Sequence, residues 1–161
     1  MRVGIFGAPG IGKTRALAAW LRCAVAPTLG VECHSTWLDG HAVVIYDTCG
    51  SAAYDSLVLP LLQDLDAVLI MYDIASRRSF GEALIWLNRA NPRRRPCALV
   101  GIPGASREVD CVAVSAAVRP WVRQGASIWA DELEARTLPA ALRYFLDKLR
   151  KKSILTPPPS T

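Results

Sequence analysis

Long apolar runs are missing from this chain of 161 residues. No apolar stretch approaches the ~18 residues that a bilayer-spanning helix needs, so the sequence predicts no transmembrane segment. The first apolar stretch leads directly into a glycine-rich motif, and we therefore expect no signal peptide. A cytoplasmic location is the expectation that follows.

Cysteine and histidine are too few and too scattered for a disulfide framework or a zinc site. The two histidines, His34 and His41, fit neighbouring strands of a hairpin, where we expect ordinary surface residues. The odd cysteine count and the lack of any C-x-x-C pair predict reduced thiols. The five cysteines are Cys23, Cys33, Cys49, Cys97 and Cys111.

Acidic residues are outnumbered, with 14 Asp and Glu against 19 Lys and Arg, which gives a net charge of +5. The excess lies mainly in Arg93-Arg94-Arg95 and between Lys148 and Lys152. No zinc-finger or RNP-like signature accompanies these clusters, so we predict no nucleic-acid binding. We interpret the clusters as a solvated loop and a helix C-terminus, with at most weak electrostatic contact to a membrane.

One phosphate-binding motif stands near the start of the chain. The loop glycines would let backbone N–H groups surround phosphates at the start of a helix. Lys13 would reach the β- and γ-phosphates, and the Thr14 hydroxyl would ligate Mg²⁺. The predicted nucleotide-binding residues match the pattern G-x-x-x-x-G-K-S/T and read Gly7, Ala8, Pro9, Gly10, Ile11, Gly12, Lys13 and Thr14.

Strand and helix patterns alternate along the chain, which predicts a doubly wound α/β fold. Asp39-Gly40 joins two extended runs and predicts one antiparallel hairpin. We expect helices on both faces of a mostly parallel, six-stranded sheet. The predicted strands are 2–6, 31–38, 41–46, 67–72, 97–101 and 127–130, and the predicted helices are 14–23, 79–90, 112–123 and 138–152.

Two details complete this prediction. Ser79 is expected to be the N-cap of its helix, with Glu82 at the capping-box spacing. Residues 1–152 form one predicted domain, and the proline-rich residues 153–161 form a predicted disordered tail.

Oxygen ligands for a metal ion recur after the phosphate loop. Asp47 follows the apolar run 43–46, where a second metal-side carboxylate is expected. Thr28, in the loop before the hairpin, would place a further oxygen on Mg²⁺. The Gly50 N–H is free to approach a γ-phosphate. The sequence therefore predicts Thr14, Thr28 and Asp47 as metal ligands and adds Gly50 to the nucleotide-binding residues.

These segments resemble the Rab branch of the Ras superfamily of small GTPases. Thr28-Leu29-Gly30-Val31-Glu32 is similar to the Rab switch I sequence T-I-G-V-D/E, and Asp47-Thr48-Cys49-Gly50 to the switch II sequence D-T-A-G. The stretch from Tyr72 to Phe80 resembles Y-D-I-T-x-x-x-S-F.

The resemblance implies a P-loop NTPase G domain that binds GTP or GDP with Mg²⁺. It implies catalytic roles for Lys13, Thr28 and, at the position of the water-positioning glutamine, Ser51. It also implies switch loops that order around the γ-phosphate. Effectors or regulators of the Rab type would bind the surface from Thr28 to Trp37 and the loop after Gly50. The family also suggests a monomer.

Several positions depart from the family pattern. Ile102-Pro103-Gly104-Ala105 replaces the guanine-reading N-K-x-D, and Glu132-Leu133-Glu134 stands near the expected S-A-K. Ser51 occupies the position of the water-positioning glutamine, and Pro9 lies where a small residue is usual beside the γ-phosphate. The last cysteine is Cys111, so no C-terminal prenylation is expected.

Three functions remain open from the sequence. The first is a Rab-like GTP/GDP switch with slow hydrolysis, acting in vesicle trafficking or signalling. The second is a pseudo-GTPase that engages or mimics Rab partners without cycling, favoured by the altered base-reading and glutamine positions. The third, less favoured, is an ATP-using P-loop kinase or ATPase.

Overall fold

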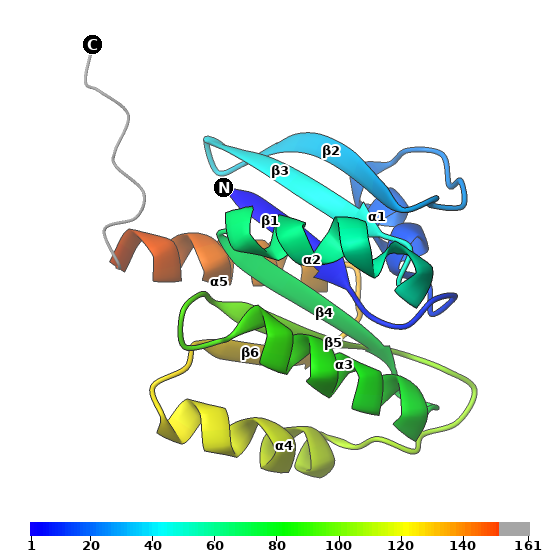
Figure 1. Cartoon of the computed structure of the whole chain (residues 1–161), viewed down its shortest axis with the longest axis vertical. Helices are drawn as coiled ribbons and strands as arrows, with labels where there is room; N and C mark the ends of the chain where they lie inside the picture. Colours follow the sequence, from blue (N-terminus) through cyan, green and yellow to red (C-terminus); the bar gives the residue numbers. More distant parts are fainter. Residues whose placement is uncertain (152–161) are drawn as a thin grey trace.

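The computed structural model describes residues 1–151, in which six strands and five α-helices alternate as a doubly wound fold requires (Figure 1). The strands are β1 (Arg2–Phe6), β2 (Val31–Leu38), β3 (His41–Thr48), β4 (Ala67–Asp73), β5 (Cys97–Ile102) and β6 (Ile128–Glu132). The helices are α1 (Lys13–Leu21), α2 (Asp55–Asp64), α3 (Arg77–Ala90), α4 (Cys111–Arg123) and α5 (Thr137–Lys151), with a short 3₁₀ turn, η1 (Ala52–Tyr54), before α2.

The six strands form one sheet in the order β2-β3-β1-β4-β5-β6. Only β2 and β3 pair antiparallel, through the hairpin at Asp39-Gly40, and the other neighbours are parallel. The predicted fold class is therefore confirmed. The order reverses direction beside β1, which places the loop after β1 at the switch point where such sheets bind ligands.

Helices cover both faces of the sheet (Figure 1). Helices α1 and α5 contribute Leu17, Phe145 and their apolar neighbours to a core on one face. Helices α2, α3 and α4 pack on the other face, where Phe6 and Trp86 stack with ring centroids 4.8 Å apart. Strands β4 and β5 lie between both cores and are almost entirely buried, as expected of central parallel strands.

Two local predictions need correction. Strand β3 continues to Thr48, so Asp47 is part of the strand, paired with Ile5 of β1, rather than the residue after it. The N-cap of α3 is Ser76, not Ser79, because the Ser76 side chain accepts a hydrogen bond from the Ser79 N–H at 3.1 Å. The helix consequently begins at Arg77, and Glu82 lies in its second turn.

Helix α2 was not predicted, and its anchor corrects the interpretation of one basic cluster. Arg95 is buried, and its guanidinium donates to the carbonyl oxygens of Leu62 and Leu65 at the end of α2. Burial lowers the pKa of Arg95. Arg95 is therefore a structural link between α2 and the segment before β5, whereas a solvated loop residue was expected.

Among residues 1–151, no helix combines the length and the apolar character needed to cross a membrane. The tail predicted for residues 153–161 lies outside the described residues, as does residue 152 of the last predicted helix.

Candidate functional site: a phosphate and metal cradle

The phosphate loop runs from the end of β1 to the start of α1. Gly7 has φ +141°, and a Cβ there would lie 2.2 Å from the carbonyl oxygen of Met71 in β4. Only glycine permits this approach of the loop to the central strand. The loop is thus held against the middle of the sheet at its carboxyl edge.

Helix α1 begins with free backbone donors. Its N-cap is Gly12, which has no side chain to cap the first turn, and no acidic residue lies in that turn. The earliest helical hydrogen bond from this end runs from the Ala16 N–H to the Gly12 carbonyl oxygen at 2.9 Å. The N–H groups at the start of the helix are therefore directed at whatever lies in the loop, which suits an anion.

Lys13 is a buried cation in this loop, with 4% of its surface exposed. Its ammonium donates to the carbonyl oxygens of Ala8 at 2.7 Å and Gly7 at 3.0 Å. Burial lowers the pKa of Lys13, while the carboxylate of Asp47 acts in the opposite direction. The loop carbonyls thus hold the ammonium at the mouth of the cradle without any carboxylate hydrogen bonded to it.

Three oxygen-bearing side chains from separate segments meet beside Lys13. The Thr14 hydroxyl donates to Asp47 Oδ2 at 2.5 Å, and the Thr28 hydroxyl donates to the same oxygen at 3.0 Å. The two hydroxyl oxygens are 2.8 Å apart. The three predicted metal ligands are therefore brought together, although they come from α1, the loop before β2, and β3.

The chemistry of this cluster fits a hard divalent cation. Asp47 is fully buried, and its second oxygen, Oδ1, has no hydrogen-bond partner. An unpartnered buried carboxylate oxygen is costly unless a cation or water satisfies it. Within residues 1–151 no three His, Cys, Asp or Glu side chains gather as a metal cluster, so a site here would combine one carboxylate with hydroxyls. That set suits Mg²⁺ completed by water and phosphate oxygens.

Gly50 lies directly against the phosphate loop. A Cβ at Gly50 would fall 2.2 Å from the Gly7 carbonyl oxygen and 2.6 Å from Lys13 Nζ. With φ +78°, the residue also adopts a backbone conformation that favours glycine. The loop after β3 therefore packs directly on the phosphate loop beside Lys13.

Ser51 lies at the same mouth but is directed elsewhere. Its hydroxyl oxygen accepts a hydrogen bond from the Ala53 N–H at 3.4 Å and so caps η1. Ser51 lines a cavity of about 340 Å³ together with Pro9 and Gly50. Ser51 therefore lies near the expected reaction centre, but its hydroxyl caps η1 instead of facing that centre.

The two segments that stand in place of the family's base-reading motifs lie side by side. The Leu133 N–H donates to the Gly101 carbonyl oxygen at 2.7 Å, which brings the segment after β6 against the end of β5. In the loop after β5, residues 103–105 are exposed and carry no carboxylate, amide or ammonium group. The segment where N-K-x-D is usual therefore offers only backbone groups to a base.

An ion pair ties these two loops together. Arg107 donates to both oxygens of Glu132, at 2.6 Å and 2.9 Å. This hydrogen bonding holds the pKa of Glu132 below its usual value. Both oxygens of the Glu132 carboxylate, at the end of β6, thus accept hydrogen bonds from the guanidinium of Arg107 in the neighbouring loop.

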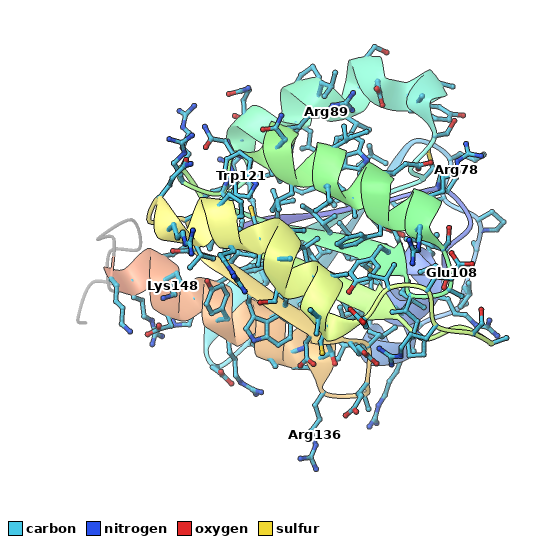
Figure 2. All side chains as sticks on the ribbon, turned by 90° about the horizontal axis from the view of Figure 1, so that it is seen from below. Arg78, Arg89, Glu108, Trp121, Arg136 and Lys148 are labelled. Carbon is cyan, nitrogen blue, oxygen red and sulfur yellow. The ribbon has the colours of Figure 1, made fainter. Side chains whose placement is uncertain are left out.

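Two charged residues beside the cradle were not identified from the sequence as part of the site. Arg78 and Glu82 lie on α3 and line two cavities that both reach Pro9. Figure 2 shows Arg78 and Arg89 toward opposite ends of α3. Their i, i+4 spacing places Arg78 and Glu82 on one helical face, but only the packing of α3 reveals that this face borders the phosphate loop.

Comparison with known proteins agrees with this geometry. The Ras family model matches residues 2–119. A probable Ras-related protein Rab-4A from Echinococcus multilocularis is 31% identical over 113 residues, covering 65% of this chain and 51% of the relative. Mouse Ras-related proteins Rab-42 and Rab-37 are 29% and 26% identical, covering 53% and 68% of this chain and 45% and 53% of their own lengths.

The chain therefore spans about half the length of the curated relatives it matches. The family match nevertheless runs from β1 into α4 and includes the phosphate loop together with Thr14, Thr28 and Asp47. This protein belongs to the Ras family and is a divergent, Rab-like member of the small GTPase superfamily.

Proposed function

We propose that this protein is a Mg²⁺-dependent GTP/GDP switch with slow hydrolysis. The observation that carries the proposal is the cluster of Thr14, Thr28 and Asp47 beside the buried Lys13. A scaffold without nucleotide has no need of a buried cation and a buried, half-satisfied carboxylate at the same loop. When bound, Mg²⁺ would neutralise phosphate charge, held by Thr14, Thr28 and Asp47.

Each residue of the cradle has a distinct task in this proposal. Lys13 binds the β- and γ-phosphates, and the N–H groups at the start of α1 bind the phosphate oxygens behind them. Gly50 contributes its backbone N–H to the γ-phosphate. Because Thr28 and Gly50 belong to different loops, the presence of a γ-phosphate would order both loops together.

Exposed apolar side chains support partner binding at these loops. Leu29 is 81% exposed, Trp37 74% and Leu57 61%. They lie on the segment from Thr28 to Trp37 and on the first turn of α2, after Gly50. Effectors or regulators of the Rab type, in vesicle trafficking or signalling, are the partners that we propose, with the protein itself a cytoplasmic monomer.

The pseudo-GTPase is the second candidate. It is favoured by the loop after β5, which carries no group to read guanine, and by the Ser51 hydroxyl, which is engaged in its own turn. In that case the protein would engage Rab partners through the same surfaces without cycling. An ATP-using kinase or ATPase has less support, since the hairpin and the segment from Tyr72 to Phe80 follow the Rab pattern.

One experiment separates these functions. The purified protein is denatured and any released nucleotide is identified, and the nucleotide-free protein is titrated with fluorescent GTP, GDP and ATP with and without Mg²⁺. Mg²⁺-dependent binding of GTP and GDP well above ATP supports the switch. Equal binding of all three means that the base is not read, and no binding leaves only the pseudo-GTPase.

A further inference from the structure

The reaction centre of the proposed switch lacks a side chain that could orient water from the loop after Gly50. In the family pattern a glutamine does so, and Ser51 is too short and already accepts the Ala53 N–H. Any substitute must come from a neighbouring element. It must also face both the phosphate loop and the loop after β3, because the γ-phosphate would lie between them.

Helix α3 presents such a group. A cavity of about 320 Å³ separates α3 from the phosphate loop, and a second of about 340 Å³ separates it from the loop after β3. The residues common to both cavities are Pro9, Arg78 and Glu82. Glu82 therefore borders Pro9 on one side and the region of Gly50 and Ser51 on the other.

The Glu82 carboxylate is held on this wall by its neighbour. Arg78 Nε donates to Glu82 Oε1 at 3.3 Å across one turn of α3. The side chain of Arg78 is 91% exposed and that of Glu82 only 34%, so Glu82 is the inner member of the pair. The negative charge of Glu82 also reaches Lys13: burial is the main influence on the pKa of Lys13, and Asp47, Cys49 and Glu82 oppose it.

We propose that Glu82 orients the water that attacks the γ-phosphate and accepts its proton as a general base, which compensates for the missing glutamine, and that Arg78 positions the Glu82 carboxylate. The water oxygen bonds to the γ-phosphorus while the bond from that phosphorus to the β–γ bridging oxygen breaks. The bridging oxygen keeps the electron pair, and the water proton passes to Glu82 and then to the released phosphate. The products are nucleoside diphosphate and inorganic phosphate.

This inference rests on the proposed nucleotide binding, so binding and hydrolysis are measured separately. Glu82→Gln keeps the size of the side chain and removes its capacity to accept a proton. We expect single-turnover hydrolysis of Mg²⁺–GTP to slow by on the order of 100-fold, a typical contribution of a positioned base. Affinity for a non-hydrolysable GTP analogue should change by less than about threefold, because Glu82 is not assigned to nucleotide binding.

A matched control removes a similar ion pair far from the cradle. Asp147 and Lys151 form an i, i+4 pair on α5 at 3.0 Å, and Asp147→Asn should leave both affinity and hydrolysis unchanged. Arg78→Ala should slow hydrolysis by a smaller factor, about 3- to 10-fold, because it releases the carboxylate without removing it. Arg78→Lys should recover part of that loss.

The decisive comparison restores glutamine to the loop after Gly50. If Glu82 activates the water in place of that glutamine, Glu82→Gln should slow hydrolysis far less in a Ser51→Gln background than in the natural protein. An equal loss in both backgrounds would overturn the assignment, as would an unchanged rate for Glu82→Gln alone. Intact nucleotide binding without any hydrolysis by the natural protein would also overturn it, whereas absent binding would overturn the proposed function itself.

Discussion

The phosphate side and the base side of the candidate site hold their polar groups in different ways. On the phosphate side, Lys13 and Asp47 are buried, and a carboxylate oxygen remains without a partner. On the base side, Arg107 and Glu132 are about half exposed, and each satisfies the other. Buried groups with spare hydrogen-bonding capacity point to a ligand, and exposed groups paired with one another do not.

The largest expected effect comes from removing the cation of the phosphate side. Lys13→Ala should weaken Mg²⁺–nucleotide binding by roughly 100-fold or more, since a charge-assisted contact to phosphate is lost in a buried site. Titration with fluorescent GTP measures this change, and Lys151→Ala on the exposed end of α5 is the control. An unaltered affinity in Lys13→Ala would mean that the loop does not bind phosphate.

The residues of the phosphate side could be proposed from the sequence because they belong to short contiguous motifs. The loop from Gly7 to Thr14 could be assigned from its motif, and Asp47 from its place at the end of an apolar run. The alternation of elements predicted a mostly parallel sheet with one hairpin, and the structure adds the strand order. Thr28 was assigned from its place between helix and hairpin, and the structure brings it to within 3.0 Å of Asp47.

What the sequence did not predict depends on contacts between distant elements. Helix α2 contains Pro60 and exposes Leu57 and Leu59, so its sequence pattern does not separate a buried face from a solvent-exposed one. Arg95 looked like part of a charged loop, and only its contacts with Leu62 and Leu65 show that it is buried. The sequence predicts Glu82 as the capping-box partner of Ser79, whereas the N-cap is Ser76 and Glu82 lies in the second turn of α3.

The next effect tests the metal side of the same cradle. Asp47→Asn removes the charge that Thr14 and Thr28 surround while keeping the shape of the side chain. We expect the affinity for Mg²⁺ in the presence of GDP to fall by about 10- to 100-fold, in the range seen for residues that support metal ligands. Mg²⁺ titrations of the nucleotide-bound protein measure it. Nucleotide affinity without Mg²⁺ should fall much less, and an equal fall in both conditions would contradict a metal role.

A smaller effect would sharpen the contrast by rebuilding the base side. Ala105 occupies the position of the guanine-reading aspartate, and Ala105→Asp adds a carboxylate to an exposed loop. The preference for GTP over ATP should rise by about tenfold, because a base-edge hydrogen bond discriminates strongly. Competition titrations measure the ratio. Ser106→Asp is the matched control with the same added charge, and an equal response from both variants would exclude base reading at position 105.

The smallest effect concerns the ion pair of the base side. Hydrogen bonds from Arg107 lower the pKa of Glu132 in the folded protein. The ion pair therefore stabilises the fold at pH values above the pKa of Glu132 in the unfolded chain. This stabilisation is lost as the pH falls through the pKa of Glu132 in the folded protein. Glu132→Gln should lower the Tm at pH 7 by at most about 2 °C, since the pair is exposed to solvent. The difference from the natural protein should shrink as the pH falls through the lowered pKa of Glu132, and it should also shrink in 1 M NaCl. A large, salt-independent loss would mean that the pair is a buried structural element.

The buried guanidinium of Arg95 has a mechanical consequence. It holds the last turn of α2 to the segment that enters β5. The first turn of α2 has a partly exposed ion pair with α3, in which Asp55 and Arg89 lie 3.4 Å apart. A displacement of Gly50 would therefore rotate α2 about its C-terminal end near Leu65, which Arg95 anchors. The outer surface near Leu57 would travel farthest, so a binding partner placed there would sense a small shift at the phosphates as a larger one.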